Sequence, residues 1–294
     1  MPAQASTYLT AGGYGSSLYP DRGHPGLFYG LEDRGPNVGA PDGSNVEPIP
    51  GFDPAIGLFR LVGGNAVLVR KIPLEDAGGH PYSGLVNSQN PTGESIEDLG
   101  GHVLANDPNG YDSEGLVALR DGTFWVSDEY GPFVTHFDAG GRALQRLSPL
   151  DGTLPAELRY RVPNRGLEGL TITPDGRMLV AMMQSALQQT DLNGSNAKNL
   201  VPDRIVTYDL RTHALHEYLY LLHDPKTNGT AVSELAALSD STFPGRWRRT
   251  RSCRSARRSR STSTRCCCRW TRSRGSSRTT RSRASPRCTA GARS

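Results

Sequence analysis

Three glutamates recur in similar surroundings and are the residues whose type and spacing best suit chemistry. Glu114, Glu168 and Glu234 each stand at the start of a short apolar run. The first two runs end in an Asp-Gly turn that leads into a second apolar run, which is typical of a β-hairpin. The spacings between the glutamates are 168 − 114 = 54 and 234 − 168 = 66 residues. A repeat near that size, built of short antiparallel strands, is typical of a β-propeller blade with its loops.

In a propeller, the first strand of every blade lies nearest the central axis. A residue repeated at the entry of that strand would therefore point into the channel, and the three glutamates would meet there. Carboxylates that close together repel one another unless a cation lies between them. Their oxygens suit Ca²⁺ or another hard divalent cation. The alternative is that each glutamate accepts hydrogen bonds from backbone amides of the next blade and only helps to close the ring.

The elements that would position these residues are short strands separated by turn dipeptides. The sequence predicts an all-β fold, namely a partial β-propeller of four-stranded antiparallel blades. Residues 73–112 are rich in Gly, Pro, Asn and Asp and are too long for a plain connection, so they predict an elaborate loop over one face. The expected strand pairs are 116–119 with 123–127, 133–138 with 142–147, 170–173 with 177–182, and 204–210 with 214–221, and further strands are expected at 27–31, 57–62 and 66–72.

Charge divides the chain into two regions. Residues 1–244 hold 16 basic and 29 acidic residues, a balance of 16 − 29 = −13, whereas residues 245–294 hold 17 arginines and no acid. After Phe243 the chain has no Ile, Leu, Val, Met, Phe or Tyr, which predicts a disordered Arg/Ser-rich tail over 245–294. The tail is interpreted as an out-of-frame translation, an indifferent extension, or an arm that binds nucleic acid. The expected domains are a flexible N-terminus over 1–11 and a propeller domain over 12–243 with about three blades and part of a fourth.

Several classes of protein are excluded by composition and motifs. All five cysteines lie in the tail, which excludes a disulfide framework or a Cys-based zinc site in the body. A Gly-x-Ser-x-Gly nucleophile elbow and a phosphate-binding Gly loop followed by Lys are both absent from the sequence. No run of about 18 apolar residues exists, so no membrane span is expected. The first residues lack the pattern of a signal peptide.

Four stretches of the sequence are 33–37 (DRGPN), 112–116 (DSEGL), 124–132 (FWVSDEYGP) and 164–170 (NRGLEGL). Together they resemble the phytase-like propeller family, which is also described as "esterase-like activity of phytase". The resemblance covers about residues 12–243, and Ser233-Glu234-Leu235 looks like the family's next blade. It implies a β-propeller, usually exported in bacteria, with hydrolase activity on phosphate or carboxylic esters. Family members normally begin with an export signal and continue through further blades, and this sequence departs from both patterns.

The resemblance also implies a set of channel residues in this sequence. A cation held by the acids would polarise an ester oxygen and activate a bound water. The guanidinium groups would hold a phosphate or carboxylate through two parallel hydrogen bonds. The expected metal ligands are Asp33, Glu114, Glu168 and Glu234, the expected anion-binding residues are Arg34 and Arg165, and the expected base is Asp128 or Glu129.

Structural roles remain open for the same residues. Arg34 could form an ion pair within the Asp33–Pro36 turn, Arg165 could pair with Glu168, and Asp128 could cap a turn beside Gly131.

The function expected from the sequence is hydrolysis of a small phosphate or carboxylic ester in the propeller channel, assisted by a divalent cation. The alternatives are a non-catalytic propeller that binds a ligand or protein, and an RNA-binding protein that acts through its tail. A monomer with a small-molecule ester or phosphoester substrate is expected, and no nucleic-acid partner. The resemblance implies export to the periplasm or the extracellular space.

Overall fold

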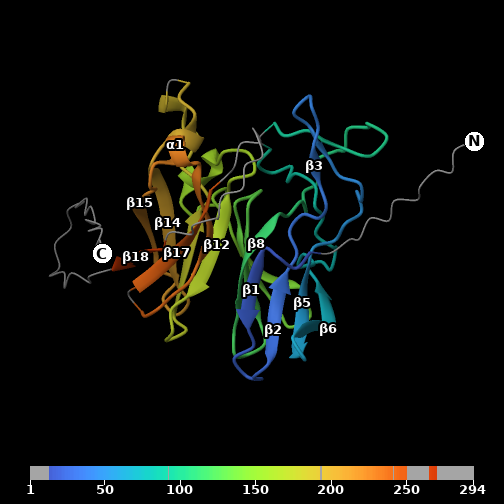
Figure 1. Cartoon of the computed structure of the whole chain (residues 1–294), viewed down its shortest axis with the longest axis vertical. Coiled ribbons are helices and arrows are strands. Elements are labelled where there is room, and N and C mark those ends of the chain that lie inside the picture. The colour runs from blue at the N-terminus through green and yellow to red at the C-terminus, as the bar shows by residue number, and fades with distance from the viewer. Residues whose placement is uncertain (1–12, 92, 193, 241, 250–264, 270–294) are drawn as a thin grey trace, which may run out of the picture. The chain divides into compact units, whose positions relative to one another are not determined.

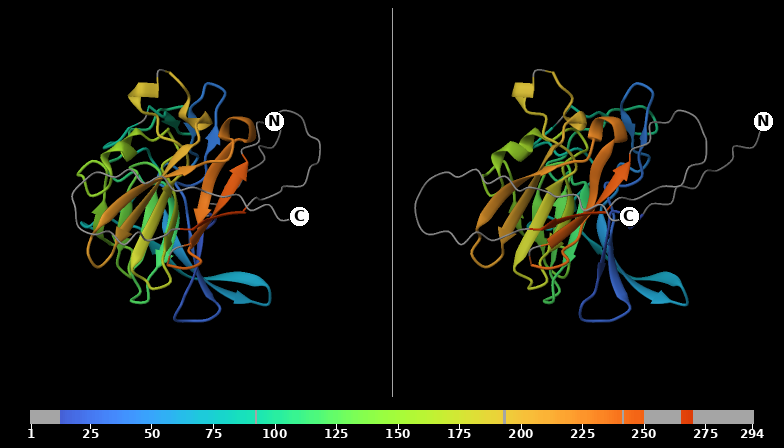
Figure 2. Two further views of the ribbon diagram at one scale, coloured as in Figure 1. Left: turned by 90° about the vertical axis from the view of Figure 1, so that its left-hand side faces the viewer. Right: turned by 60° about the vertical axis from the view of Figure 1, so that its left-hand side comes forward.

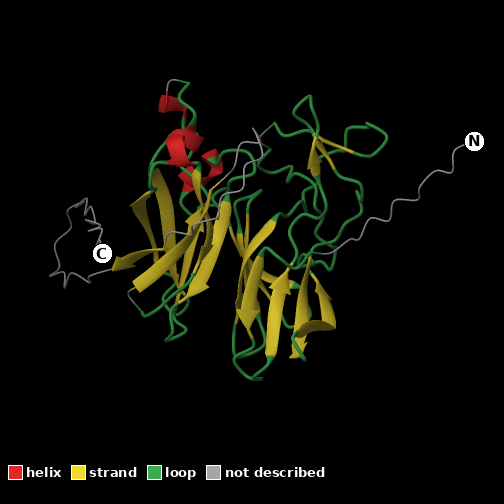
Figure 3. Cartoon of the chain, in the orientation of Figure 1, coloured by secondary structure: helices red, strands yellow, loops and turns green. Residues whose placement is uncertain are grey.

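Antiparallel strands dominate the computed structural model, which describes residues 13–91, 93–192, 194–240, 242–249 and 265–269. Its described helices are one α-helix of four residues and three short 3-10 helices (Figures 1 and 3). The predicted fold class is confirmed, because three of the described sheets are four-stranded and antiparallel, as the blades of a β-propeller are. The described residues fall into two compact units, one drawn from 1–131 and 135–146 and the other from 132–134 and 147–294.

The first blade of the first unit is a meander of four strands in sequence order. Its two outer strands form a long hairpin that diverges from the hairpin of the inner strands (Figure 2). Gly63 and Gly64 make the turn with φ values of 57° and 84°. Both lie in the left-handed region that a two-residue hairpin turn requires, and glycine adopts this region without strain. The strands are β1 (Ser17–Pro20), β2 (Leu27–Leu31), β5 (Ala55–Val62) and β6 (Asn65–Pro73).

The second blade of this unit is also a four-stranded meander. Its first strand lies beside that of the first blade, as neighbouring propeller blades require. The Ser113 hydroxyl donates a 2.6 Å hydrogen bond to the backbone oxygen of Glu32, and the Leu116 N–H donates to Ser17 Oγ at 3.3 Å. The strands are β8 (Ser113–Ala118), β9 (Phe124–Asp128), β10 (Val134–Phe137) and β11 (Ala143–Leu147).

The segment predicted as an elaborate loop, 73–112, is woven into the core of the first unit. Tyr82 and Tyr111 are buried, and their rings are in tilted contact with centroids 4.6 Å apart. Val86 and Ile96 pack against Tyr130 in a second buried cluster. A small sheet pairs part of this segment in parallel with an earlier part of the chain. Its strands are β3 (Val38–Gly39), β4 (Asn45–Val46) and β7 (Ile96–Glu97).

The second unit holds a four-stranded blade and a three-stranded sheet. Apolar side chains of both sheets, among them Val180, Ile205 and Val232, form one core cluster. The four-stranded blade consists of β12 (Leu167–Ile172), β13 (Met178–Met183), β14 (Pro202–Asp209) and β15 (Leu215–Leu221), and the other sheet of β16 (Thr230–Leu235), β17 (Thr242–Arg249) and β18 (Arg265–Arg269). The helices are η1 (Ala156–Tyr160), η2 (Thr190–Leu192), η3 (Ala197–Asn199) and α1 (Pro225–Asn228).

Most of the segments predicted to lack a fold lie outside the described residues. These are residues 1–11 and, within 245–294, residues 250–264 and 270–294. Residues 245–249 and 265–269 belong to β17 and β18. Disorder over the whole tail therefore stays a prediction.

Candidate metal centre

A bulge in the second blade gathers three carboxylates. Ser113 pairs with Asp128 across β8 and β9, and the next pair in register is Leu116 with Val126. Glu114 and Gly115 therefore share one partner position, and the Gly115 N–H donates to Ser127 Oγ at 2.9 Å. A bulge of this kind redirects a side chain and is frequent beside active sites.

The bulge and the ends of the two strands bring Asp112, Glu114 and Glu129 together. Each can offer one carboxylate oxygen such that all three oxygens lie within 4.8 Å of one another. Asp112 and Glu129 are buried and Glu114 is partly exposed. The donor set consists of carboxylate oxygens alone, which fits Ca²⁺ or Mg²⁺ and not a soft metal.

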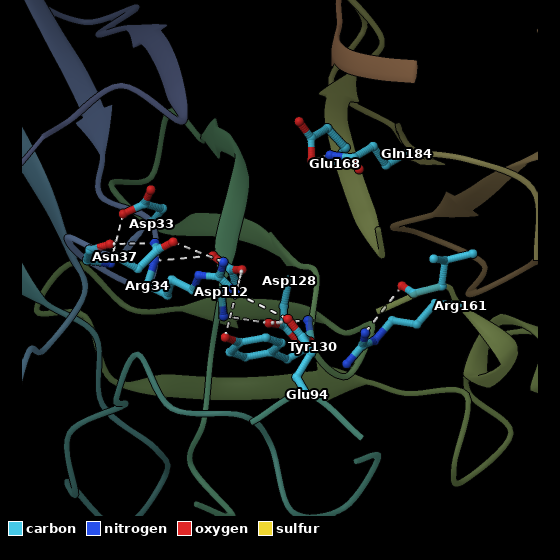
Figure 4. Close-up of polar contacts among 12 residues, drawn as sticks. Asp33, Arg34, Asn37, Glu94, Asp112, Asp128, Tyr130, Arg161, Glu168 and Gln184 are labelled. Carbon is cyan, nitrogen blue, oxygen red and sulfur yellow. Dashed lines mark hydrogen bonds and ion pairs between the residues drawn. The ribbon is translucent and has the colours of Figure 1, made fainter. Parts of the chain in front are cut away.

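Arg34 lies next to this cluster and its positive charge is engaged by acids (Figure 4). Its guanidinium lies 3.6 Å from both Glu94 and Asp112, and it donates to the Tyr130 hydroxyl at 2.8 Å. It also donates to Asn37 Oδ1 at 3.3 Å. These acids raise the pKa of Arg34 although burial alone would lower it. The guanidinium therefore orients and partly neutralises buried acids, and binding a phosphate would require it to give up these contacts.

Burial dominates the protonation of Asp112. The side chain is enclosed, and this raises its pKa against the opposing pull of the Arg34 guanidinium. Its Oδ1 accepts a 3.2 Å hydrogen bond from the backbone N–H of Arg34. A cation beside Asp112 would stabilise the ionised carboxylate that burial disfavours.

Asp128 caps the turn that carries Glu129. Its carboxylate accepts hydrogen bonds from the backbone N–H groups of Asp112 at 2.8 Å, Tyr130 at 3.0 Å and Gly131 at 2.5 Å. The side chain is fully buried. This is the turn-capping geometry left open by the sequence, and it positions two of the three clustered carboxylates. A role of Asp128 as a base stays a prediction.

Asp33 makes a local contact in the same unit. Its Oδ1 accepts a 2.8 Å hydrogen bond from the N–H of Gly35, a residue whose φ is 100°. The ion pairs of Arg34 are made with Glu94 and Asp112. Asp33 as a metal ligand stays a prediction.

The small sheet adds two carboxyl groups that the sequence did not single out. The parallel pairing of β4 with β7 places Glu47 directly after one strand and Glu94 shortly before the other. Glu47 is 2% exposed, and its Oε1 has no hydrogen-bond partner among the described residues. Burial raises the pKa of Glu47 to about 7, Arg34 opposes this rise, and Glu94 and Asp33 add to it.

The second unit repeats the bulge with different chemistry. Leu167 pairs with Met183 and Gly169 with Met182, which leaves Glu168 as the extra residue. Glu168 thus corresponds to Glu114. Gln184, directly after β13, corresponds to Glu129, directly after β9. The Gln184 amide donates a 2.7 Å hydrogen bond to Glu168 Oε2 (Figure 4).

The register of the third repeat differs from the sequence prediction. Val232 pairs with Trp247 and Glu234 with Arg246, so Ser233 is the extra residue. Ser233, and not Glu234, corresponds to Glu114 and Glu168, and Glu234 is exposed. The predicted equivalence of Glu234 is therefore wrong by one residue, and its role as a metal ligand stays a prediction.

Arg165, the other expected anion-binding residue, lies in a turn ahead of β12. Its N–H donates to the Val162 carbonyl oxygen at 3.0 Å, and its side chain is partly exposed. Its role in binding an anion stays a prediction.

The sequence and the structure thus agree in part on the site. Among the expected residues, Glu114 and Glu129 meet in one cluster, and Arg34 lies beside it. Asp112, Glu47 and Glu94 were missed. For Asp112 a signal existed, because it stands two residues before Glu114 in the stretch that carries the family resemblance.

A model of one known protein family matches most of this chain. The model of the family described as "Phytase-like: Esterase-like activity of phytase" matches residues 10–251. The chain belongs to this family. The resemblance seen in the sequence is therefore confirmed for the phytase-like domain, which includes the whole second blade and its carboxylate cluster.

Individual relatives of this phytase-like chain are distant. An "uncharacterized secreted protein" of Arthroderma benhamiae is 34% identical over 139 residues, which are 38% of this chain and 27% of the relative. The chain thus matches less than a third of that relative's length.

Solved structures of similar fold are more distant in sequence. A Lactobacillus plantarum protein is 12% identical with a TM-score of 0.36, covering 76% of this chain and 61% of that one. Kuenenia stuttgartiensis hydrazine synthase is 10% identical with a TM-score of 0.34, covering 76% and 60%. The β-propeller domain of Cps50 (Swd1) from Myceliophteria thermophila is 9% identical with a TM-score of 0.31, covering 76% and 64%.

The helices in the described part of the chain are too short and too polar to cross a bilayer.

Proposed function

We propose that this phytase-like propeller domain binds a divalent cation through Asp112, Glu114 and Glu129 and hydrolyses phosphate or carboxylic esters beside it. The observation that carries the proposal is the approach of three carboxylate oxygens to within 4.8 Å, two of them from buried side chains. The family membership supports the ester substrate class.

The balance of buried charge supports a cation. In the first unit, the described buried charged side chains comprise five carboxyl groups and one guanidinium, that of Arg34. Buried charges require partners of opposite sign or must be neutralised by protons. A divalent cation supplies two positive charges where two of these carboxyl groups, Asp112 and Glu129, meet the partly exposed Glu114. The five carboxyl groups belong to Glu32, Glu47, Asp112, Asp128 and Glu129.

The blade of the second unit serves as an internal comparison. At the positions of Glu114 and Glu129 it has Glu168 and Gln184, and the amide donates a hydrogen bond to the carboxylate. An amide and a carboxylate satisfy each other directly, whereas two carboxylates need a proton or a cation between them. The difference at one position, Gln184 against Glu129, is therefore the feature that favours a cation in the second blade.

Each neighbouring residue has a defined part in this proposal. A bound divalent cation would polarise a phosphoryl or acyl oxygen and lower the pKa of a bound water. Arg34 holds Asp112 and Glu94 by charge. Asp128 accepts two hydrogen bonds from the turn of Glu129 and a third from the backbone N–H of Asp112. Glu47 is a carboxyl group whose pKa of about 7 allows it to exchange a proton near neutrality.

The test is a calorimetric titration of the EDTA-treated full chain with Ca²⁺, Mg²⁺ and Mn²⁺. The wild type should bind one cation in the second blade. Glu114→Gln and Glu129→Gln should each weaken binding about tenfold or more, because each removes a charged ligand. Hydrolysis of p-nitrophenyl phosphate and p-nitrophenyl acetate, with and without the cation, then measures turnover.

Glu168→Gln is the matched control, since it makes the same substitution at the corresponding position of another blade. It should leave cation affinity unchanged. Equal losses of cation affinity in Glu114→Gln and Glu168→Gln would instead support one cation shared among the repeats. Unchanged affinity in both variants would refute the proposed cation site.

A non-catalytic propeller that binds a cation or another ligand is the second candidate. The contacts of Arg34 favour this candidate, because its guanidinium already pairs with Glu94 and Asp112 and would have to leave them to bind an anionic substrate. Cation binding without turnover of either ester would support this candidate.

We propose export for this protein as well, on the basis of the family resemblance and of the relative described as secreted. Its detection in the culture medium or the periplasm tests this. Salt-dependent RNA binding by residues 245–294 would identify the third alternative.

A further inference from the structure

The outer half of the β5–β6 hairpin exposes five large apolar side chains. Two of them precede the Gly63-Gly64 turn and three follow it after Asn65 and Ala66, and each is about half exposed. The exposed fractions are 53% for Leu61, 54% for Val62, 50% for Val67, 46% for Leu68 and 49% for Val69.

Both faces of the hairpin contribute to this apolar tip. Successive residues of a strand point to opposite faces, so Leu61 and Val62 lie on different sides, as do Val67 and Leu68. Beyond the Arg60–Val67 pair, the tip consists of two further residue pairs and the turn. The Leu61 N–H donates a 3.1 Å hydrogen bond to the Gly26 carbonyl oxygen of the β1–β2 hairpin, and beyond Leu61 the end of the β5–β6 hairpin diverges from it (Figure 2).

The charged residues of the β5–β6 hairpin itself are all basic. Between Asp53 and Glu75 the charged residues are Arg60, Arg70 and Lys71, whereas residues 1–244 as a whole carry a balance of −13. Arg60 is exposed, Arg70 donates to the Ala139 carbonyl oxygen, and Lys71, 47% exposed, lies 3.4 Å from Glu32 Oε2. The hairpin thus has apolar residues near its turn and basic residues farther from it. This arrangement complements a lipid bilayer, whose surface is anionic and whose interior is apolar.

We propose that the tip of the β5–β6 hairpin inserts into the interface of an anionic lipid bilayer. Three residue steps from Arg60 to the turn span about 10 Å, which matches the depth of interfacial insertion. Leu61 and Val62 would then be inserted, and anionic headgroups would lie at the level of the Arg60–Val67 pair, with Leu68, Val69 and Arg70 behind it. A bilayer covers both faces of the tip at once, whereas a protein partner packed on one face would leave the other exposed. This inference is independent of the proposed hydrolase.

The experiment measures co-sedimentation of the full chain with vesicles of phosphatidylcholine and with vesicles of phosphatidylcholine and phosphatidylserine. Leu61→Asp and Val62→Asp, on opposite faces, should each reduce binding about tenfold, because each removes an apolar side chain from lipid. Arg60→Gln should reduce binding about fivefold, and only to the anionic vesicles.

Leu144→Asp, at an exposed β11 residue with 57% exposure, is the matched control and should bind as the wild type does. It introduces the same charge, so it also accounts for attraction between the vesicles and the 17 arginines of residues 245–294. Equal binding by Leu61→Asp and Leu144→Asp would overturn the proposal. A lipid-free dimer that only one of the two tip variants abolishes would also overturn it, since a second copy would then cover one face.

Discussion

The substitution Glu129→Gln tests whether the carboxylates of Glu114 and Glu129 repel each other when no cation is bound. Glu129→Gln gives this blade the amide that the second unit has at Gln184, where it donates a 2.7 Å hydrogen bond to Glu168. The variant should be more stable than the wild type without a cation and should bind the cation more weakly. The reciprocal variant, Gln184→Glu, should be less stable without a cation.

The magnitude follows from the separation of the carboxylates. Two unit charges 4.8 Å apart repel by about 3.5 kcal/mol at an effective dielectric constant of about 20. Glu114 is partly exposed and solvent screens it, so we expect Glu129→Gln to raise the free energy of unfolding by about 1–2 kcal/mol in EDTA. Saturating Ca²⁺ should reverse the order of the two proteins, because a ligand stabilises the protein that binds it more tightly.

Urea unfolding followed by circular dichroism, in EDTA and in Ca²⁺, measures both effects. Gln184→Glu is the control for a general effect of the exchange, because it should shift stability in the opposite direction. A Glu129→Gln protein that is less stable than the wild type in EDTA would refute the reasoning. Equal stabilisation of the wild type and Glu129→Gln by Ca²⁺ would refute it too.

Other predictions concern the two carboxyl groups that support the site, and the hairpin. The pKa of Glu47 is about 7 when folded and ordinarily 4.5, so the folded protein holds the extra proton between these values and loses stability as pH rises through this window. Glu47→Gln should remove this loss, so that its free energy of unfolding exceeds that of the wild type by about 2 kcal/mol above pH 7. Urea unfolding at several pH values measures this difference, and identical pH profiles of the two proteins would contradict it. Asp128→Ala should lower the free energy of unfolding by about 3 kcal/mol or more, because it leaves three buried N–H groups without their acceptor. Urea unfolding measures this, and a decrease below about 1 kcal/mol would exclude the capping role. Leu61→Asp should weaken binding to anionic vesicles while Leu144→Asp does not, by co-sedimentation.

Local patterns explain why the blades were predictable from the sequence. Turn dipeptides such as Asp121-Gly122 mark hairpins, and the strands found there, β8 and β9, overlap the predicted runs. The strand expected at 27–31 is β2, Leu27–Leu31. Alternation and turn chemistry are properties of neighbouring residues, so they can be read without knowing which segments meet in space.

The cluster was only partly predictable because it depends on register. A bulge decides which residue leaves the ladder, and this placed Ser233 where the sequence repeat predicts Glu234. Glu47 directly follows β4, whose parallel pairing with β7 spans two residues and is too short to leave a periodic signal. Asp112 precedes the repeat's glutamate by two residues, and only the strand ends bring it to Glu129.

Anomalous diffraction from a crystal grown with Mn²⁺ would test the central claim most directly, because it locates the cation without reference to activity. The account predicts an anomalous peak among the carboxylate oxygens of Asp112, Glu114 and Glu129. A peak bound by Glu168 or Glu234 instead, or a crystal with Mn²⁺ at other sites and none within this cluster, would contradict it.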